Sequence, residues 1–249
     1  MFTADDRTRV RSELLDLASS DSRISGAAIT GSAAAGHEDQ WSDVDLAFGL
    51  VEGTELADVL SDWTAYMYDR HRAVHHLDVR AGAWIYRVFL LADTLQVDLA
   101  FVTEAEFRAL APSFRLAFGK AQESRHTPPA RAEDLIGMAW LYALHARSSI
   151  ARGRLWQAAH MVSGVRDHAL AHACLRHGLP TAHGRGFDRL PPEVTARFEG
   201  SLVRHLDSAE LTRAFAVAMD GLRFEIQAAD EALGARLQPT LIQLSSTTR

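Results

Sequence analysis

Two aspartates, Asp43 and Asp45, have a spacing that could place their carboxylates together at a cation-binding site. They stand two positions apart in residues 42–48 (SDVDLAF), which alternate between polar and apolar side chains. Side chains two positions apart on a strand project from the same face, so these carboxylates would lie side by side. Adjacent carboxylates repel each other unless a cation lies between them, and Mg²⁺ prefers such oxygen ligands. The segment therefore predicts a divalent-cation site.

Two further features complete the expected site. Asp98 lies within the apolar run 95–102, where an unpaired charge would be costly. Gly31-Ser32 joins a small apolar segment to a short alanine run, a pattern typical of a strand–helix turn whose backbone N–H groups can approach phosphate. Two Mg²⁺ ions held by aspartates can orient the attacking and leaving oxygens of a phosphoryl transfer. In the alternative interpretation Asp43 caps a turn, Asp45 is a solvated strand residue, and Asp98 pairs with Arg87.

The elements that must position these residues form an α+β chain. Periodicity in the first half predicts helices over 5–18 and 53–70, and strands over 24–30, 42–48, 73–79, 84–91 and 95–102. Paired prolines at 128–129 indicate a hinge beginning at 126, and the later segments 133–152, 154–176, 192–206 and 208–233 have helical periodicity. We expect a mixed β-sheet domain flanked by helices over residues 1–125, followed by an all-α helical bundle over 126–249.

The order Gly31-Ser32, Asp43-x-Asp45 and a later Asp98 resembles the DNA polymerase β-like nucleotidyltransferase superfamily. The motif match covers residues 26–102, and the helical second half is similar in layout to the small-molecule branch, the aminoglycoside and lincosamide nucleotidyltransferases. The resemblance implies that Asp43, Asp45 and Asp98 hold two Mg²⁺ ions, and that Gly31 and Ser32 bind the β- and γ-phosphates of ATP or another NTP. It further implies transfer of a nucleoside monophosphate, with AMP expected, to a hydroxyl of a small-molecule acceptor, with release of pyrophosphate.

The second half is expected to supply the remaining groups. Glu133 begins a predicted helix and is the candidate general base, with Asp134 and Asp98 as alternatives, although a helix dipole favours acidic residues in any first turn. Arg166 either contacts the triphosphate or forms an interhelical ion pair. Arg166 and His172 also fit a loose pattern of RNA-cleaving helical domains, a minor alternative.

Composition narrows the partners and the compartment. The formal net charge is −6, which disfavours a nucleic-acid partner. The single cysteine cannot form an intramolecular disulfide, and neither a signal peptide nor a membrane-spanning run is found, so we expect a cytoplasmic protein without a membrane partner. The sequence leaves open whether it is a monomer or a homodimer.

Three alternatives remain from the sequence. The first is a small-molecule nucleotidyltransferase, for which an aminoglycoside-type antibiotic is a candidate acceptor. The second is a protein- or tRNA-directed nucleotidyltransferase similar to the antitoxin-like members of the superfamily. The third is a nucleotide-binding regulatory module with a decayed site. His168 and His172 lack the glutamate of a zinc motif, so zinc is not expected. Trp41, beside the paired aspartates, either borders the nucleotide base or packs.

Overall fold

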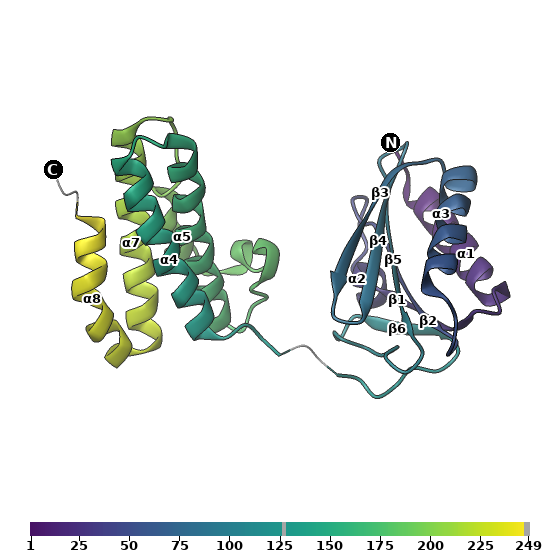
Figure 1. The fold of residues 1–249 in the computed structure, drawn as a ribbon. Coiled ribbons are helices and arrows are strands. Elements are labelled where there is room, and N and C mark those ends of the chain that lie inside the picture. The colour runs from purple at the N-terminus through teal and green to yellow at the C-terminus, as the bar shows by residue number, and fades with distance from the viewer. Residues whose placement is uncertain (126–127, 247–249) are drawn as a thin grey trace. The chain divides into compact units, whose positions relative to one another are not determined.

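The chain consists of two compact units, Met1–Thr127 and Pro128–Arg249. The structure, a computed structural model, describes residues 1–125 and 128–246 (Figure 1). His126 and Thr127 of the expected hinge lie outside the described residues. Each unit has a core of its own, and each is described separately below.

The first unit is built on one mixed sheet. Its strands lie in the order β3-β4-β5-β2-β1-β6. β2 and β5 are parallel, and the other neighbours are antiparallel. The strands are β1 (Ile24–Thr30), β2 (Val44–Leu50), β3 (Ala73–Ala81), β4 (Trp84–Leu91), β5 (Gln96–Thr103) and β6 (Phe114–Phe118). β6 was not expected from the sequence.

Two helices, α1 (Ala4–Ser20) and α3 (Leu56–His71), cover one face of the sheet (Figure 1). The apolar positions of the alternating strands point into this layer, where the rings of Phe48, Trp63 and Phe101 pack at centroid distances of 4.8–5.7 Å. Because strand side chains alternate, burying Leu46 and Leu99 on this face directs Asp45 and Asp98 to the opposite one. The helix-covered core thus decides which face carries the carboxylates.

The opposite face has a smaller apolar cluster. Ala47, Ala100, Trp84 and Phe107 belong to this cluster. The short helix α2 (Gly31–Ala35) directly follows β1, and its Ala33 and Ala34 pack against the helix-covered core. Small residues on β2 and β5 leave room above the central strands. Any ligand of the aspartates would therefore lie against this less covered face.

The second unit is helical, with α4 (Ala132–Ala151), α5 (Leu155–Arg176), α6 (Pro192–Glu199), α7 (Ser208–Ala229) and α8 (Glu231–Ser245), and two short 3-10 turns at 182–184 and 187–189. The predicted helix 192–206 ends at Glu199. The predicted helix 208–233 is broken at Asp230, whose side chain accepts a hydrogen bond from the Leu233 amide and so begins α8.

The observed architecture confirms the α+β fold class, a mixed sheet with flanking helices followed by a helical region. Among the described residues, no helix combines the length and the apolar character needed to cross a bilayer.

Candidate functional site

The three aspartates meet on the open face of the sheet. β2 and β5 pair in parallel with Asp45 directly opposite Asp98, and Asp43 lies immediately before β2. One carboxylate oxygen from each lies within 4.8 Å of the others, and all three residues are half-buried. Oxygen ligands at this separation suit a hard divalent cation. The structure thus brings together the three residues that the sequence singled out as metal ligands.

Crowding and burial perturb the third carboxylate. Burial is the largest cause that raises the pKa of Asp98, and the neighbouring charge of Asp43 adds to it, so that the pKa reaches about 6. Gln96 opposes the rise, because its Nε2 donates to Asp98 Oδ1 at 3.0 Å; the same nitrogen also lies 3.4 Å from Asp43 Oδ2. The amide of Gln96 therefore bridges two carboxylates, a role that the sequence analysis missed. Its position two residues before Asp98 on one strand was the available signal.

The alternative in which Arg87 neutralises Asp98 is wrong. Arg87 projects from the other face of β4 and forms a two-pronged ion pair with Asp78, with N–O distances of 2.7 and 2.8 Å. Its Nη1 also donates to the Leu60 carbonyl and to Thr64 Oγ1. The arginine is fully used in joining β3, β4 and α3.

Gly31 packs directly against Asp45. Its φ is +61°, and a Cβ at this position would lie 1.8 Å from Asp45 Oδ2 and 2.6 Å from Asp45 Cγ. Only glycine tolerates both the left-handed conformation and this approach. The turn is thus held beside the aspartates, and the adjacent Ser32 Oγ is buried without a hydrogen-bond partner among residues 1–125 and 128–246. A buried hydroxyl of this kind is available to a ligand oxygen.

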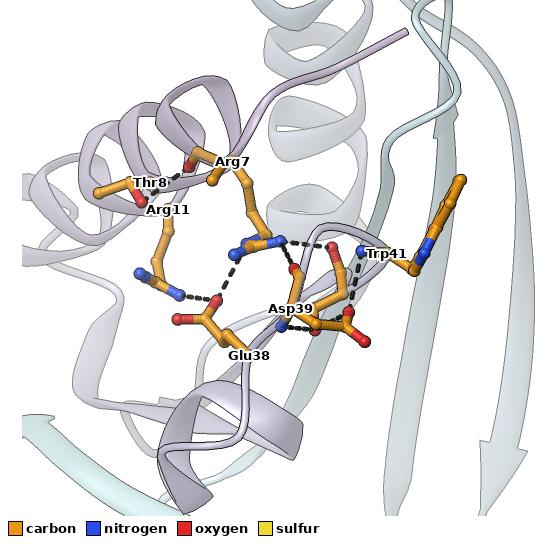
Figure 2. A network of polar contacts seen from close by, with 8 residues as sticks. Arg7, Thr8, Arg11, Glu38, Asp39 and Trp41 are labelled. Atoms are coloured by element: carbon orange, nitrogen blue, oxygen red, sulfur yellow. Dashed lines mark hydrogen bonds and ion pairs between the residues drawn. The ribbon is translucent and has the colours of Figure 1, made fainter.

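A buried arginine holds the loop that leads into Asp43. Figure 2 shows Arg7 of α1 reaching to this loop, where its Nη1 donates to the Asp39 carbonyl at 2.5 Å and to the Ser42 carbonyl at 3.2 Å. Glu38 of the same loop pairs with Arg7 Nε at 3.0 Å and with Arg11 Nη1 at 2.6 Å. Arg7 is only 4% exposed, so the contact is shielded from water. The sequence analysis missed this arginine, because periodicity alone gives no reason for a charge on the buried side of a helix.

Asp39, and not Asp43, stabilises the turn in this loop. Its Oδ1 accepts hydrogen bonds from the Trp41 amide at 2.9 Å and from Ser42 Oγ at 3.1 Å (Figure 2). The alternative in which Asp43 caps the turn is therefore not supported. Trp41 itself is 68% exposed, so the alternative in which it packs is not supported, and a contact with the nucleotide base is not tested.

In the second unit, Glu133 and Asp134 occupy the first turn of α4 and are both exposed, with Glu133 ion-paired to Arg131. Arg166 on α5 pairs with Asp167, the next residue, at 2.9 Å, and within the described residues it forms no ion pair with another helix. The roles of Glu133 as general base and of Arg166 in binding triphosphate stay predictions.

His172 is buried in the helical core. It is 2% exposed, and burial lowers its pKa. An imidazole in this position does not reach an RNA phosphate, so the pattern of Arg166 and His172 does not support an RNA-cleaving site. His168 Nδ1 lies 2.8 Å from the Gly164 carbonyl, as expected for a histidine that serves helix packing.

Of three comparisons with known proteins, the one with solved structures finds matches. No family model matches the chain, and no curated protein sequence matches it. Among solved structures, the chain is similar to the crystal structure of an aminoglycoside 6-adenyltransferase from Bacillus subtilis. The two are 12% identical, with a TM-score of 0.42 over 99% of this chain and 100% of that one.

Proposed function

We propose that this protein is a Mg²⁺-dependent nucleotidyltransferase that moves a nucleoside monophosphate, with AMP expected, from an NTP to a hydroxyl of a small molecule. The observation that carries the proposal is the group formed by Asp43, Asp45 and Asp98, whose ligand oxygens lie within 4.8 Å of one another. The turn at Gly31 is in direct contact with this group through Asp45. A cation site beside a turn with a free hydroxyl is the combination that binding of a nucleoside triphosphate requires.

The donor set fits Mg²⁺. All three candidate ligands are carboxylates, which are hard oxygen donors, and burial together with the neighbouring charge of Asp43 raises the pKa of Asp98. When bound, Mg²⁺ would neutralise phosphate charge and orient the attacking and leaving oxygens. Gln96 would hold Asp98 and Asp43 in place through its side-chain amide.

The order of the strands indicates from which side the acceptor would approach the α-phosphate. Gly31 and Ser32 follow β1, the paired aspartates belong to β2, and Asp98 belongs to β5 on the far side. Attack and departure occur on opposite sides of the phosphorus in an in-line displacement. With the β- and γ-phosphates at Gly31 and Ser32, the acceptor hydroxyl approaches the α-phosphorus from the side of β5 and β4.

In the transfer itself, the acceptor oxygen forms a bond to the α-phosphorus while the bond to the bridging oxygen breaks and pyrophosphate leaves. The hydroxyl proton passes to a carboxylate. Glu133 is our candidate for this base, with Asp134 and Asp98 as alternatives. Arg166 is proposed to contact the triphosphate, because guanidinium groups bind phosphate oxygens in pairs.

The proposal is tested by incubating the protein with labelled ATP, Mg²⁺ and a panel of aminoglycosides and lincosamides. A labelled adduct and released pyrophosphate are expected for at least one acceptor, and their absence with every NTP would contradict the small-molecule reaction. Asp43→Asn and Asp45→Asn should each abolish transfer and Mg²⁺-dependent NTP binding. Asp16→Asn, an exposed aspartate on α1, is the matched control and should change neither.

The same assay separates the alternatives. A decayed regulatory module binds NTP without releasing pyrophosphate. A protein- or tRNA-directed enzyme labels a macromolecule in place of the panel, and the net charge of −6 opposes the tRNA version.

A further inference from the structure

A cavity of about 140 Å³ opens on the same sheet face as the aspartates. Two of its lining residues are Ala47 and Ala100, each two positions beyond an aspartate on the same strand. A strand rises about 3.3 Å per residue, so these alanines lie about 7 Å from Asp45 and Asp98. Thr30, the residue before Gly31, also lines the cavity. The cavity therefore lies next to the proposed site for the phosphates and the metal.

The walls are aromatic and apolar. Trp84 and Tyr86 lie along β4 with their rings stacked, at a centroid distance of 6.0 Å and an interplanar angle of 28°. Phe114 and Leu110 line the cavity as well. An apolar cavity of roughly 150 Å³ accepts a benzene ring, so this space suits one flat ring that is open to extension at its mouth.

A residue that lines the cavity has one buried polar atom without a hydrogen-bond partner among the described residues. Arg108 lines it, and its Nε is buried and makes no hydrogen bond within residues 1–125 and 128–246. Its Nη2 donates to the Ala105 carbonyl at 2.6 Å and forms an ion pair with Glu106 Oε2 at 3.5 Å. A buried N–H without an acceptor is unfavourable, and a ligand with a ring nitrogen or carbonyl oxygen would satisfy it. The hydroxyl of Ser113 lies on the same lining.

We propose that this cavity binds the nucleobase of the NTP, an inference that rests on the proposed function. The base is a flat ring with hydrogen-bond acceptors. One ribose separates it from the α-phosphate, and this separation matches the distance between the aspartates and the cavity residues Ala47 and Ala100. A polycationic acceptor does not fit this cavity, because its apolar walls offer ammonium groups no partner. Such an acceptor would have to bind elsewhere.

The test compares two probes by isothermal titration calorimetry, Mg-ATP and Mg-tripolyphosphate, which has the phosphates without the base. Tyr86→Leu removes a stacking ring, and Arg108→Met removes the buried donor while keeping the alkyl stem. Each should weaken Mg-ATP binding about tenfold, the effect of losing one aromatic or hydrogen-bonding contact to a base, and leave Mg-tripolyphosphate binding unchanged. Trp41→Ala is the control, since Trp41 is the competing aromatic group near Asp43. It should change neither affinity.

The inference is overturned if ATP binds both cavity variants as tightly as the wild type, or if the affinities of a cavity variant for the two probes fall in parallel. It is also overturned if Trp41→Ala alone weakens ATP binding, or if the wild type does not prefer ATP to tripolyphosphate. Circular dichroism identifies a variant that fails to fold, in which case the other variant decides. Failure of the proposed function has a different signature. ATP binding then depends on Tyr86 and Arg108, but no nucleotide is transferred.

Discussion

Replacing Asp98 by asparagine should stabilise the first unit at neutral pH. The pKa of this carboxyl is raised from its usual 3.8 to about 6, first by burial and then by the charge of Asp43. Asparagine has nearly the same shape, and its side-chain oxygen can still accept the hydrogen bond from Gln96. The variant therefore removes a poorly solvated charge with little change in packing.

The expected effect depends on pH with a definite sign. Between pH 4 and 6 the folded protein binds a proton at Asp98 that the unfolded chain has already released, so the free energy of unfolding falls as the pH rises. A difference of about two pH units amounts to ~3 kcal/mol above pH 6.5, as an order of magnitude and an upper bound. Asp98→Asn should thus match the wild type near pH 3.5 and exceed its stability by up to this amount at pH 7.5.

The measurement is urea unfolding of both proteins at a series of pH values, followed by tryptophan fluorescence, to which Trp63 in the core of the first unit contributes. Only the difference between variant and wild type is used, because other groups titrate equally in both. Asp16→Asn should show no pH-dependent difference. Added Mg²⁺ should stabilise the wild type and not Asp98→Asn. A variant that is no more stable than the wild type at pH 7.5 would refute the argument that Asp98 is destabilised by burial and by its neighbour.

Two further predictions concern the parts that position the site. Gly31→Ala should eliminate Mg-ATP binding, because the added Cβ displaces the Asp45 carboxylate. The control Gly36→Ala, also at positive φ but with open space around it, should cost only about 1–2 kcal/mol of backbone strain and keep binding. Calorimetry measures the binding, and thermal melts measure the stability. Arg7→Met should lower stability by about 3 kcal/mol and weaken Mg-ATP binding, because it leaves the carbonyls of Asp39 and Ser42 without their buried partner. Arg9→Met, which removes an exposed surface pair, should leave the stability close to that of the wild type, and equal losses in the two arginine variants would contradict the role given to Arg7.

Much of the fold could be predicted from local patterns. Alternating residues gave five of the strands, and helical periodicity gave the two helices that cover the sheet. The short edge strand β6 was missed, because five residues provide too little alternation to distinguish them from a loop. The break between α7 and α8 was also missed, since the apolar period continues across Asp230 and only the cap reveals the new helix.

Some features of the candidate site could likewise be predicted from local sequence patterns, and others could not. By itself the sequence determined the types of the candidate metal ligands and the face of each strand to which they belong, because side-chain direction on a strand follows from the alternation of residues. It also determined that a glycine begins the turn after β1. These properties are local, and no tertiary contact is needed to state them.

Only the tertiary structure decided which of these side chains meet. Two strands, β3 and β4, separate β2 from β5 in the sequence, yet the sheet places β5 beside β2 and sets Asp98 opposite Asp45. The choice of strand neighbours depends on how the whole core packs. The same holds for the hydrogen bonds of Arg7 to the loop before Asp43, for the contacts of the Gln96 amide with two carboxylates, and for the cavity lined by Ala100. Contacts between distant segments follow from burial and close packing of the complete chain, and a local pattern of residues does not contain that information.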